Sequence, residues 1–220
     1  TSGNVWHLGL TEASTGLKFS KRLPDKKAVT VLGALKEVVA EAKFMCGNDV
    51  KIARWHSDDD NSFKGVVDEW ILDSKCVRTN TGGYASNKNA IQERSNRKLH
   101  EIARTMLRTA THGNAQYKDV WDALMMHVAD VANNQPESGE ECPIQRAGGK
   151  RVDMYKQYHP ALCHAVYRLP DPHIPDKFTD KACDAIWCGR SKTVSGGDIL
   201  LPIEWNEADG MWDIGTHIVS

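Results

Sequence analysis

The stretch NAIQERSNR, residues 89–97, opens a strong helical pattern that continues to Thr109 with few breakers and many charges. It follows a polar, glycine-containing segment, TNTGGYASN at residues 79–87, which predicts a mobile loop. Upstream, the stretch SDDDNSF at residues 57–63 comes directly after a β-favouring run at residues 50–57. The sequence therefore predicts one acidic group at a strand end, Asp58, and another in the first turn of a helix, Glu93.

Two carboxylates placed in this way, together with a third, hold two Mg²⁺ ions in enzymes that catalyse in-line phosphoryl transfer. Asp58 and Glu93 are the candidates for the catalytic and metal-binding role. The alternative is structural, because Asp58, Asp59 and Asp60 are equally suited to cap a helix or to line a solvated turn. Taken alone, Glu93 beside its arginines is an ordinary helix-surface pair.

The rest of the chain predicts an α/β fold. Two strands joined by a turn are expected over residues 5–23, and apolar residues at helical spacing follow over residues 27–44. Further elements are a helix at 63–72, a short β-like piece at 75–78, a helix at 117–134, and three short β-like runs between residues 162 and 205. This order predicts a central mixed sheet flanked by helices, followed by a small β-rich extension.

Length and composition set broad limits. The chain has 220 residues, of which 40% are hydrophobic and 26% charged, a globular balance that allows a core of useful size. The polar segment at residues 135–151 suggests a core over 1–138, a linker over 139–151 and an extension over 152–220. No membrane span or secretory signal is expected, and an intracellular location is favoured. A net charge of −1 argues against a wholly basic nucleic-acid-binding surface.

The cysteines predict reduced thiols, not a metal site. None of the six lies in a CxxC pair. A zinc site would have to be assembled from His159, Cys163, Cys183 and Cys188, whose spacings only loosely match known zinc sites. Buried thiols are the favoured interpretation.

At residues 54–138 the chain resembles the second half of the catalytic core of Ty1/copia retrotransposon integrases. The family's DNGxEF motif corresponds to residues 58–63, its tyrosine-containing loop to Tyr84, and its NGxxERxNR motif to residues 89–97. Asp58 and Glu93 are 35 positions apart, close to the family's spacing. The resemblance implies a ribonuclease-H-like core, and weaker similarity extends to both ends of the chain. The family also has an N-terminal zinc-binding region, and whether this protein has lost it stays open.

The departures from the family pattern imply an incomplete catalytic triad. The first catalytic aspartate of the family corresponds to Thr11. Glu12 is the nearest substitute, but a step of one residue along a strand points to the opposite face. Asp59, Asp60, Ser62 and Ala90 also replace motif residues of the family.

Residues 88–108 carry six lysines or arginines against two glutamates. A basic helix face of this kind binds nucleic-acid phosphates with a salt-dependent affinity. The resemblance implies that Arg97 and His100 approach DNA. The alternative is a solvated helix face. The candidate nucleic-acid-binding residues are Lys88, Arg94, Arg97, Lys98, His100 and Arg104.

Three functions remain open. The first hypothesis is a degenerate integrase-like domain that binds nucleic acid or has a structural role, with weak or no catalysis and no cofactor. The second is an active Mg²⁺-dependent DNA strand-transfer integrase. The third is a domesticated scaffold subunit of a larger assembly. DNA or another nucleic acid, protein partners and further copies of the chain are the expected partners, and a nuclear location rests on the resemblance alone.

Overall fold

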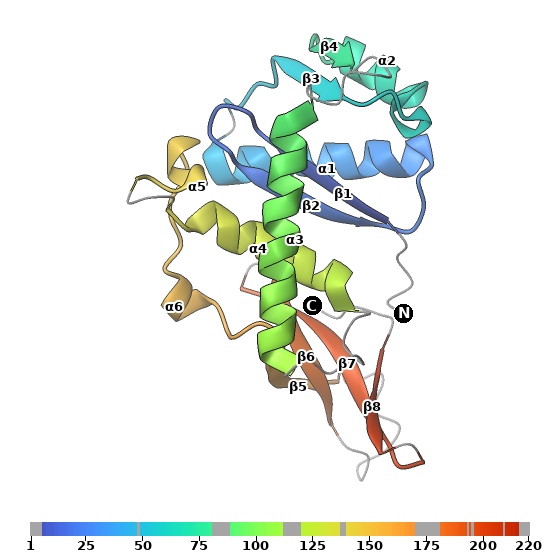
Figure 1. Cartoon of the computed structure of the whole chain (residues 1–220), viewed down its shortest axis with the longest axis vertical. Helices are drawn as coiled ribbons and strands as arrows, with labels where there is room; N and C mark the ends of the chain where they lie inside the picture. The colour runs from blue at the N-terminus through green and yellow to red at the C-terminus, as the bar shows by residue number, and fades with distance from the viewer. Residues whose placement is uncertain are drawn as a thin grey trace. The chain divides into compact units, whose positions relative to one another are not determined.

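The computed structural model describes residues 6–47, 49–80, 89–111, 120–136, 140–169, 181–192, 194, 196–208 and 210–215 (Figure 1). The chain folds into two compact units, each assembled from separate parts of the sequence. The core unit comprises residues 4–102 and 128–154, and the C-terminal unit consists chiefly of residues 103–127 and 155–220. The two units are described separately below.

The core unit begins with the predicted hairpin. Strands β1 (Trp6–Thr11) and β2 (Lys18–Leu23) pair antiparallel, in a register that runs from Trp6 opposite Leu23 to Thr11 opposite Lys18. Successive side chains of a strand point to opposite faces. Leu8 and Leu10 therefore lie on one face of the hairpin, whereas His7, Gly9 and Thr11 lie on the other.

Helix α1 (Ala28–Cys46) covers the first of these faces, as its apolar spacing predicted. Leu8 and Leu10 pack into a cluster with α1 and with α2, which is described next. An ion-pair network adds to this contact, because Lys21 of β2 lies 3.2 Å from Glu37 and 3.3 Å from Glu41 of α1. The buried members of the cluster are Leu23, Val31, Ala34, Leu35, Val67, Ile71 and Cys76.

A parallel crossover follows. Strand β3 (Arg54–Ser57) leads through the 3-10 turn η1 (Asn61–Phe63) and helix α2 (Val66–Asp73) to strand β4 (Val77–Asn80), which pairs parallel with β3. Parallel strands require such a crossover, because a tight turn can only reverse the chain. Trp55 packs against Trp70, with ring centroids 6.0 Å apart.

The structure differs from the prediction of one central mixed sheet. Antiparallel and parallel pairings both occur, but over the described residues of the core unit they form two separate two-stranded sheets, β1–β2 and β3–β4. Backbone hydrogen bonding between neighbouring strands decides this point. Sequence periodicity reports which face of a strand is buried and carries no information on its neighbour.

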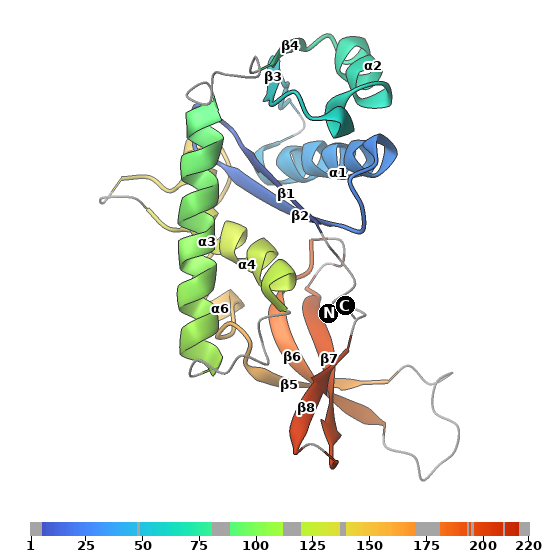
Figure 2. The same ribbon diagram turned by 45° about the vertical axis from the view of Figure 1, so that its right-hand side comes forward.

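Helices α3 (Ala90–Thr111) and α4 (Trp121–Asn134) confirm the two predicted helices. The first part of α3 lies along the second face of the β1–β2 hairpin (Figure 2). The end of α4 binds β2 directly. The side chain of Asn133 accepts a hydrogen bond from the Lys18 backbone N–H at 2.8 Å and donates one to the Lys18 carbonyl at 2.7 Å. Helices thus cover both faces of the hairpin.

The segment predicted as a linker is packed over its described residues. Cys142 is the N-cap residue of helix α5 (Pro143–Arg146), and both Cys142 and Ile144 are buried beside Leu17 and Phe19 of the hairpin. Asn134, the last residue of α4, accepts through its side chain a hydrogen bond from the Val152 N–H at 2.8 Å. The described residues of this segment therefore pack against the core unit, although its polar composition had suggested an unpacked linker.

The C-terminal unit holds the small β-rich region. After the short helix α6 (Met154–Gln157), strands β5 (His164–Arg168), β6 (Ala182–Arg190), β7 (Asp198–Asn206) and β8 (Met211–Ile214) form an antiparallel sheet in that order. The first three strands match the predicted β-like runs, and β8 was not predicted. The core of the C-terminal unit contains the buried residues Val120, Ala123, Cys188 and Leu201.

None of the helices within the described ranges combines the length and the apolar character needed to cross a membrane. All six cysteines are free thiols, and Cys76, Cys142 and Cys188 are buried. Cys163 and Cys183 are only half-buried, so the expectation of buried thiols holds for Cys188 alone among the three cysteines considered for a zinc site.

Candidate functional site

The candidate site lies where β1 meets the first turns of α3 in the core unit. The Thr11 hydroxyl donates a 2.7 Å hydrogen bond to the hydroxyl of Ser95, 84 positions along the chain. Gly9 allows this close approach, because a methyl group there would lie 2.8 Å from Asn96 Oδ1 and 3.2 Å from Gln92 Nε2. The end of β1 and the first turns of α3, which carry Glu93, are therefore neighbours.

Thr11 is the residue that, in our prediction, corresponds to the first catalytic aspartate of the family. Its side chain is half-buried and its hydroxyl is bound to a second neutral hydroxyl, Ser95, which is itself buried. The contact holds β1 against α3 without placing a negative charge between them.

Glu12, the possible substitute, is bound within its own turn. Its carboxylate accepts hydrogen bonds from the backbone N–H groups of Ser14 at 3.0 Å and Thr15 at 2.6 Å, and from both of their hydroxyls. Burial by itself would raise the pKa of Glu12, but these hydrogen bonds outweigh it and lower the pKa to about 2. The structure thus assigns Glu12 to shaping the β1–β2 turn.

This turn predicts a pH dependence of stability. Because the pKa of Glu12 falls from 4.5 to about 2 on folding, its contribution is present above about pH 4.5 and is lost as the pH falls toward 2. Glu12→Gln is therefore expected to flatten the acid side of a plot of melting temperature against pH, with a small effect because the side chain is exposed. Thermal melts of both proteins between about pH 2.5 and 7 measure this. Parallel curves over that range would contradict it.

The three consecutive aspartates have different environments. Asp60 caps the turn η1 by accepting from the Ser62 N–H at 2.8 Å, and this hydrogen bond lowers the pKa of Asp60. Asp59 forms an ion pair with Lys64 at 3.3 Å. Asp58 is exposed and has no ion pair with any described residue. The capping alternative is therefore right for Asp60, and Asp58 is the carboxylate available to a ligand.

Glu93 lies in the first turn of α3 and is exposed. Over the described residues, the structure brings no three His, Cys, Asp or Glu side chains close enough together to hold a metal ion. Asp58 and Glu93 thus remain two single exposed carboxylates. Among the described residues, His159, Cys163, Cys183 and Cys188 likewise form no such group, and burial raises the pKa of the Cys163 thiol.

The predicted basic side chains of α3 are all at the surface. Only a narrow stripe of the helix is buried, made by Ser95, Leu99, Ala103 and Thr111. Within the described part of the chain, neither Arg94 nor Arg97 forms an ion pair. Lys88 and Tyr84 lie outside the described residues. The exposed predicted residues are Arg94, Arg97, Lys98, His100 and Arg104.

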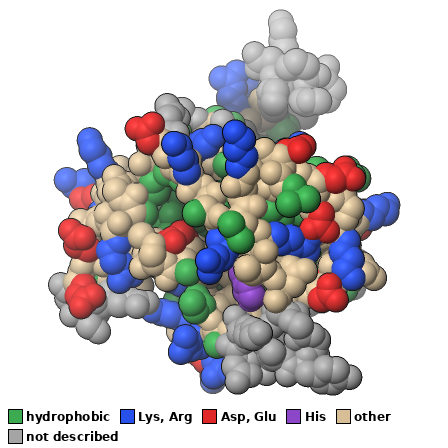
Figure 3. All heavy atoms as spheres, turned by 90° about the horizontal axis from the view of Figure 1, so that it is seen from above, with side chains coloured by type: hydrophobic (Ala, Val, Ile, Leu, Met, Phe, Trp, Pro, Cys, Tyr) green, Lys and Arg blue, Asp and Glu red, His purple; other side chains and the backbone are tan. Residues whose placement is uncertain are grey.

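The surface charge is mixed. On the face drawn in Figure 3, Lys and Arg side chains are interspersed with Asp and Glu. This agrees with the net charge of −1 and confines any contact with a polyanion to a local surface such as α3.

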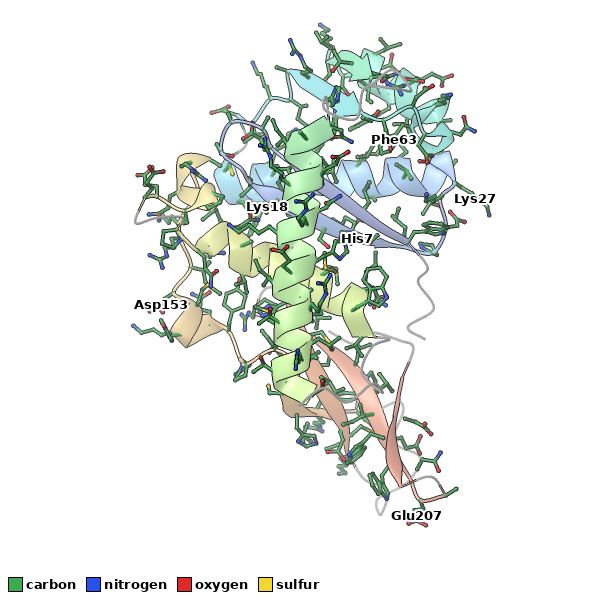
Figure 4. All side chains as sticks on the ribbon, in the orientation of Figure 1. His7, Lys18, Lys27, Phe63, Asp153 and Glu207 are labelled. Carbon is green, nitrogen blue, oxygen red and sulfur yellow. The ribbon has the colours of Figure 1, made fainter. Side chains whose placement is uncertain are left out.

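Two histidines lie where β1 meets α3. His7 was not among the predicted site residues, and His100 was predicted to bind nucleic acid. His7 of β1, labelled in Figure 4, lies 2.7 Å from the Ser20 hydroxyl, and its ring centroid is 6.3 Å from that of His100 on α3. The alternation of β1 could have revealed His7, because it shares a face with Thr11. Its proximity to His100 depends on the packing of α3 and was not available from the sequence.

Comparison with known proteins gives a likeness of fold. The chain is similar to a chain of the simian T-cell lymphotropic virus intasome in complex with PP2A regulatory subunit B56 gamma, with a TM-score of 0.50 and 12% identity over 96% of this chain and 70% of that one. It is also similar to the catalytic core domain of BIV integrase, with a TM-score of 0.47 and 15% identity over 64% of this chain and 84% of that one. No family model and no curated protein matches the chain.

The comparison supports a fold. The protein is a mixed α/β protein whose fold resembles that of the intasome chain over most of the sequence, which is consistent with the expected ribonuclease-H-like fold. At 12% identity the likeness concerns the fold alone. The role of the site follows from its own residues.

Proposed function

We propose that this protein is an integrase-like domain that binds the phosphate backbone of nucleic acid and has weak or no catalytic activity. The observation that carries the proposal is the hydrogen bond from Thr11 to Ser95 at the place where a metal-bridging carboxylate would be required. The Ty1/copia type is the particular relationship that the motifs at residues 58–63 and 89–97 support.

The donor set does not fit a two-metal centre. Two Mg²⁺ ions need several carboxylate oxygens, because these supply both the coordination and the negative charge that offsets two divalent cations. Asp58 and Glu93 supply two carboxylates, Thr11 supplies a neutral hydroxyl, and Glu12 is bound within its turn. We therefore derive no catalytic step from this site, and an active strand-transfer enzyme is the less supported alternative.

Nucleic-acid binding is supported by the exposed arginines of α3. A guanidinium group forms two parallel hydrogen bonds with a phosphate, and it does so most readily when no carboxylate of the same chain competes. Arg94 and Arg97 meet this condition within the described residues. The similarity of fold to a chain of a viral intasome is consistent with this role.

Binding of a fluorescein-labelled DNA duplex, followed by anisotropy at several salt concentrations, tests this proposal. Wild-type affinity is expected to fall steeply with salt. Arg94→Gln/Arg97→Gln is expected to weaken binding by about tenfold and to reduce the slope of log affinity against log salt by about two. Arg54→Gln, at an exposed arginine of β3, is the matched control. Equal losses in the control and the double variant, or no binding by the wild type, would refute the proposed function.

Restoring the missing carboxylate tests the degenerate site. Thr11→Asp is expected to bind Mn²⁺ at least about tenfold more tightly than the wild type in titration calorimetry, because it supplies the absent negative charge. Adding Asp58→Asn and Glu93→Gln should abolish that gain. Thr11→Val, which removes the hydroxyl without adding charge, is the control. Tight Mn²⁺ binding by the wild type that depends on Asp58 and Glu93 would instead favour the active enzyme.

A protein-binding scaffold is the second candidate function. One observation favours it: Trp205 of β7 is 49% exposed and stacks edge-on against Trp212 of β8 at 5.3 Å. Exposed tryptophans are frequent anchors of protein interfaces. A Trp205→Ala variant that loses a cellular partner while retaining DNA affinity would support this role.

A further inference from the structure

The hairpin of β7 and β8 carries an aromatic pair at the surface of the C-terminal unit. Trp205 lies directly opposite Trp212 in the antiparallel register, with the ring centroids 5.3 Å apart. Leu201 is on the same face of β7 as Trp205, because the two are four residues apart. Leu201 is fully buried, whereas Trp205 is 49% exposed. The core of the unit therefore covers this face at one end of β7 and leaves the end with the tryptophan pair exposed.

The opposite face of the same hairpin carries two carboxylates. Glu204 lies directly opposite Asp213, and both side chains are exposed. Asp213 accepts a hydrogen bond from the Asn206 amide at 3.0 Å, and neither carboxylate forms an ion pair with a described residue. Like charges directly opposite one another on a sheet are destabilising. A cationic group placed between the two carboxylates would remove this repulsion.

The sequence that forms this hairpin is acidic throughout. Residues 193–220 contain five Asp or Glu and no Lys or Arg, although the net charge of the whole chain is only −1. Glu207, labelled in Figure 4, adds an exposed carboxylate at the turn between the two strands. A partner complementary to this surface is therefore cationic. Exposed tryptophans can also stack on bases, but the negative charge around this pair repels nucleic acid.

Strand β8 also has an edge at which a further strand can be added. Over the described residues its only neighbour in the sheet is β7. The backbone N–H and C=O groups along an unpaired edge can pair with an extended segment of another chain. The side chains of such a segment alternate between the two faces of the sheet. A segment beside β8 would therefore present successive side chains to the Trp212 face and to the Asp213 face.

We propose that the β7–β8 hairpin is a docking surface for an extended, lysine- and arginine-rich segment of another protein. The segment pairs along β8. Its cationic side chains on one face lie against the tryptophan pair, since the ring face of tryptophan attracts cations more strongly than that of other aromatic side chains. Those on the other face approach Glu204 and Asp213. This inference rests on the scaffold candidate, to which it gives a partner chemistry, and it is independent of nucleic-acid binding by α3.

Binding of a short fluorescein-labelled peptide of Lys, Arg and Thr to the full chain, followed by anisotropy at low salt, tests the docking surface. Glu204→Gln/Asp213→Asn is expected to weaken binding by about five- to tenfold, because it removes both carboxylates. Its melting temperature should not fall, since the like-charge contact is also removed. Glu69→Gln/Asp73→Asn is the matched control, because both are exposed carboxylates of α2 without an ion pair to a described residue. Equal losses in the two variants, or no binding by the wild type, would overturn the proposal.

Two substitutions at Trp205 test the aromatic contact. Trp205→Leu keeps an apolar side chain but removes the ring, and it is expected to weaken peptide binding by about threefold or more. Trp205→Phe keeps a ring and is expected to retain most of the affinity. Peptide binding by Trp205→Leu as tight as that of the wild type would overturn the proposal.

DNA affinity, measured in parallel, separates this surface from the proposed function. Trp205→Leu is expected to bind DNA like the wild type, and Arg94→Gln/Arg97→Gln is expected to bind the peptide like the wild type. A failure of DNA binding alone would leave the docking surface standing. Loss of DNA affinity in Trp205→Leu would assign the tryptophan pair to nucleic acid and would overturn the docking proposal.

Discussion

Replacing Asn133 with alanine is expected to lower the free energy of unfolding of the core unit by about 2–6 kcal/mol. The Asn133 side chain is fully buried and is bound to both backbone groups of Lys18, its N–H at 2.8 Å and its carbonyl at 2.7 Å. Alanine would leave both groups buried without this partner, and each such loss costs about 1–3 kcal/mol. Urea unfolding measured by far-ultraviolet circular dichroism determines the change.

Asn61→Ala is the matched control for this measurement. Asn61 begins the turn η1, is exposed, and should change stability by less than about 0.5 kcal/mol when its amide is removed. A loss of stability in Asn133→Ala no greater than that of the control would mean that water replaces the amide at Lys18. The contact would then no longer explain how α4 is held to the edge of β2.

Replacing Trp187 with alanine is expected to destabilise the C-terminal unit by about 3–5 kcal/mol. Trp187 is 1% exposed and its ring contacts those of His127, Tyr158 and His159 at centroid distances of 5.0, 6.3 and 5.5 Å. Its indole N–H donates a 2.9 Å hydrogen bond to Asp198. The substitution therefore removes an aromatic contact centre and leaves a cavity.

Hydrogen exchange locates this effect. Amides of β5, β6 and β7 should exchange faster in Trp187→Ala, whereas those of β1 and β2 should keep their protection, because the two units have separate cores. Trp205→Ala serves as the control, since Trp205 is 49% exposed and its removal opens less of the interior. Uniform loss of protection throughout the chain would show that the units unfold together.

Most elements could be predicted from local patterns. The hairpin at residues 5–23, the helix at 27–44 and the long helix opened by NAIQERSNR occur within a few residues of the expected bounds. Strand β8 was missed because MWDI at residues 211–214 is short and follows a turn without a clear alternation. Its pairing with β7 comes from tertiary contact, including Trp205 opposite Trp212.

The candidate site was predicted only in part. The acidic residues Asp58 and Glu93 and the arginines of α3 are exposed, which a sequence pattern can suggest. The binding of Glu12 within its turn and the contact of Thr11 with Ser95 could not be predicted, because each depends on hydrogen bonds between side chains whose positions only folding sets. The roles of these residues in binding a metal or DNA remain predictions for the experiments above.

The sequence by itself determined which residues form helices and strands and which of their faces are apolar, since 3.6-residue and two-residue periodicities are local properties of the chain. The correspondence of Thr11 to the first aspartate of the integrase pattern rests on the resemblance and stays a prediction. Only the tertiary structure decided that β1–β2 and β3–β4 form separate sheets in the described core unit, that Asn133 binds Lys18, and that Thr11 meets Ser95. These are long-range contacts, and their free energies depend on packing between segments that no local pattern records.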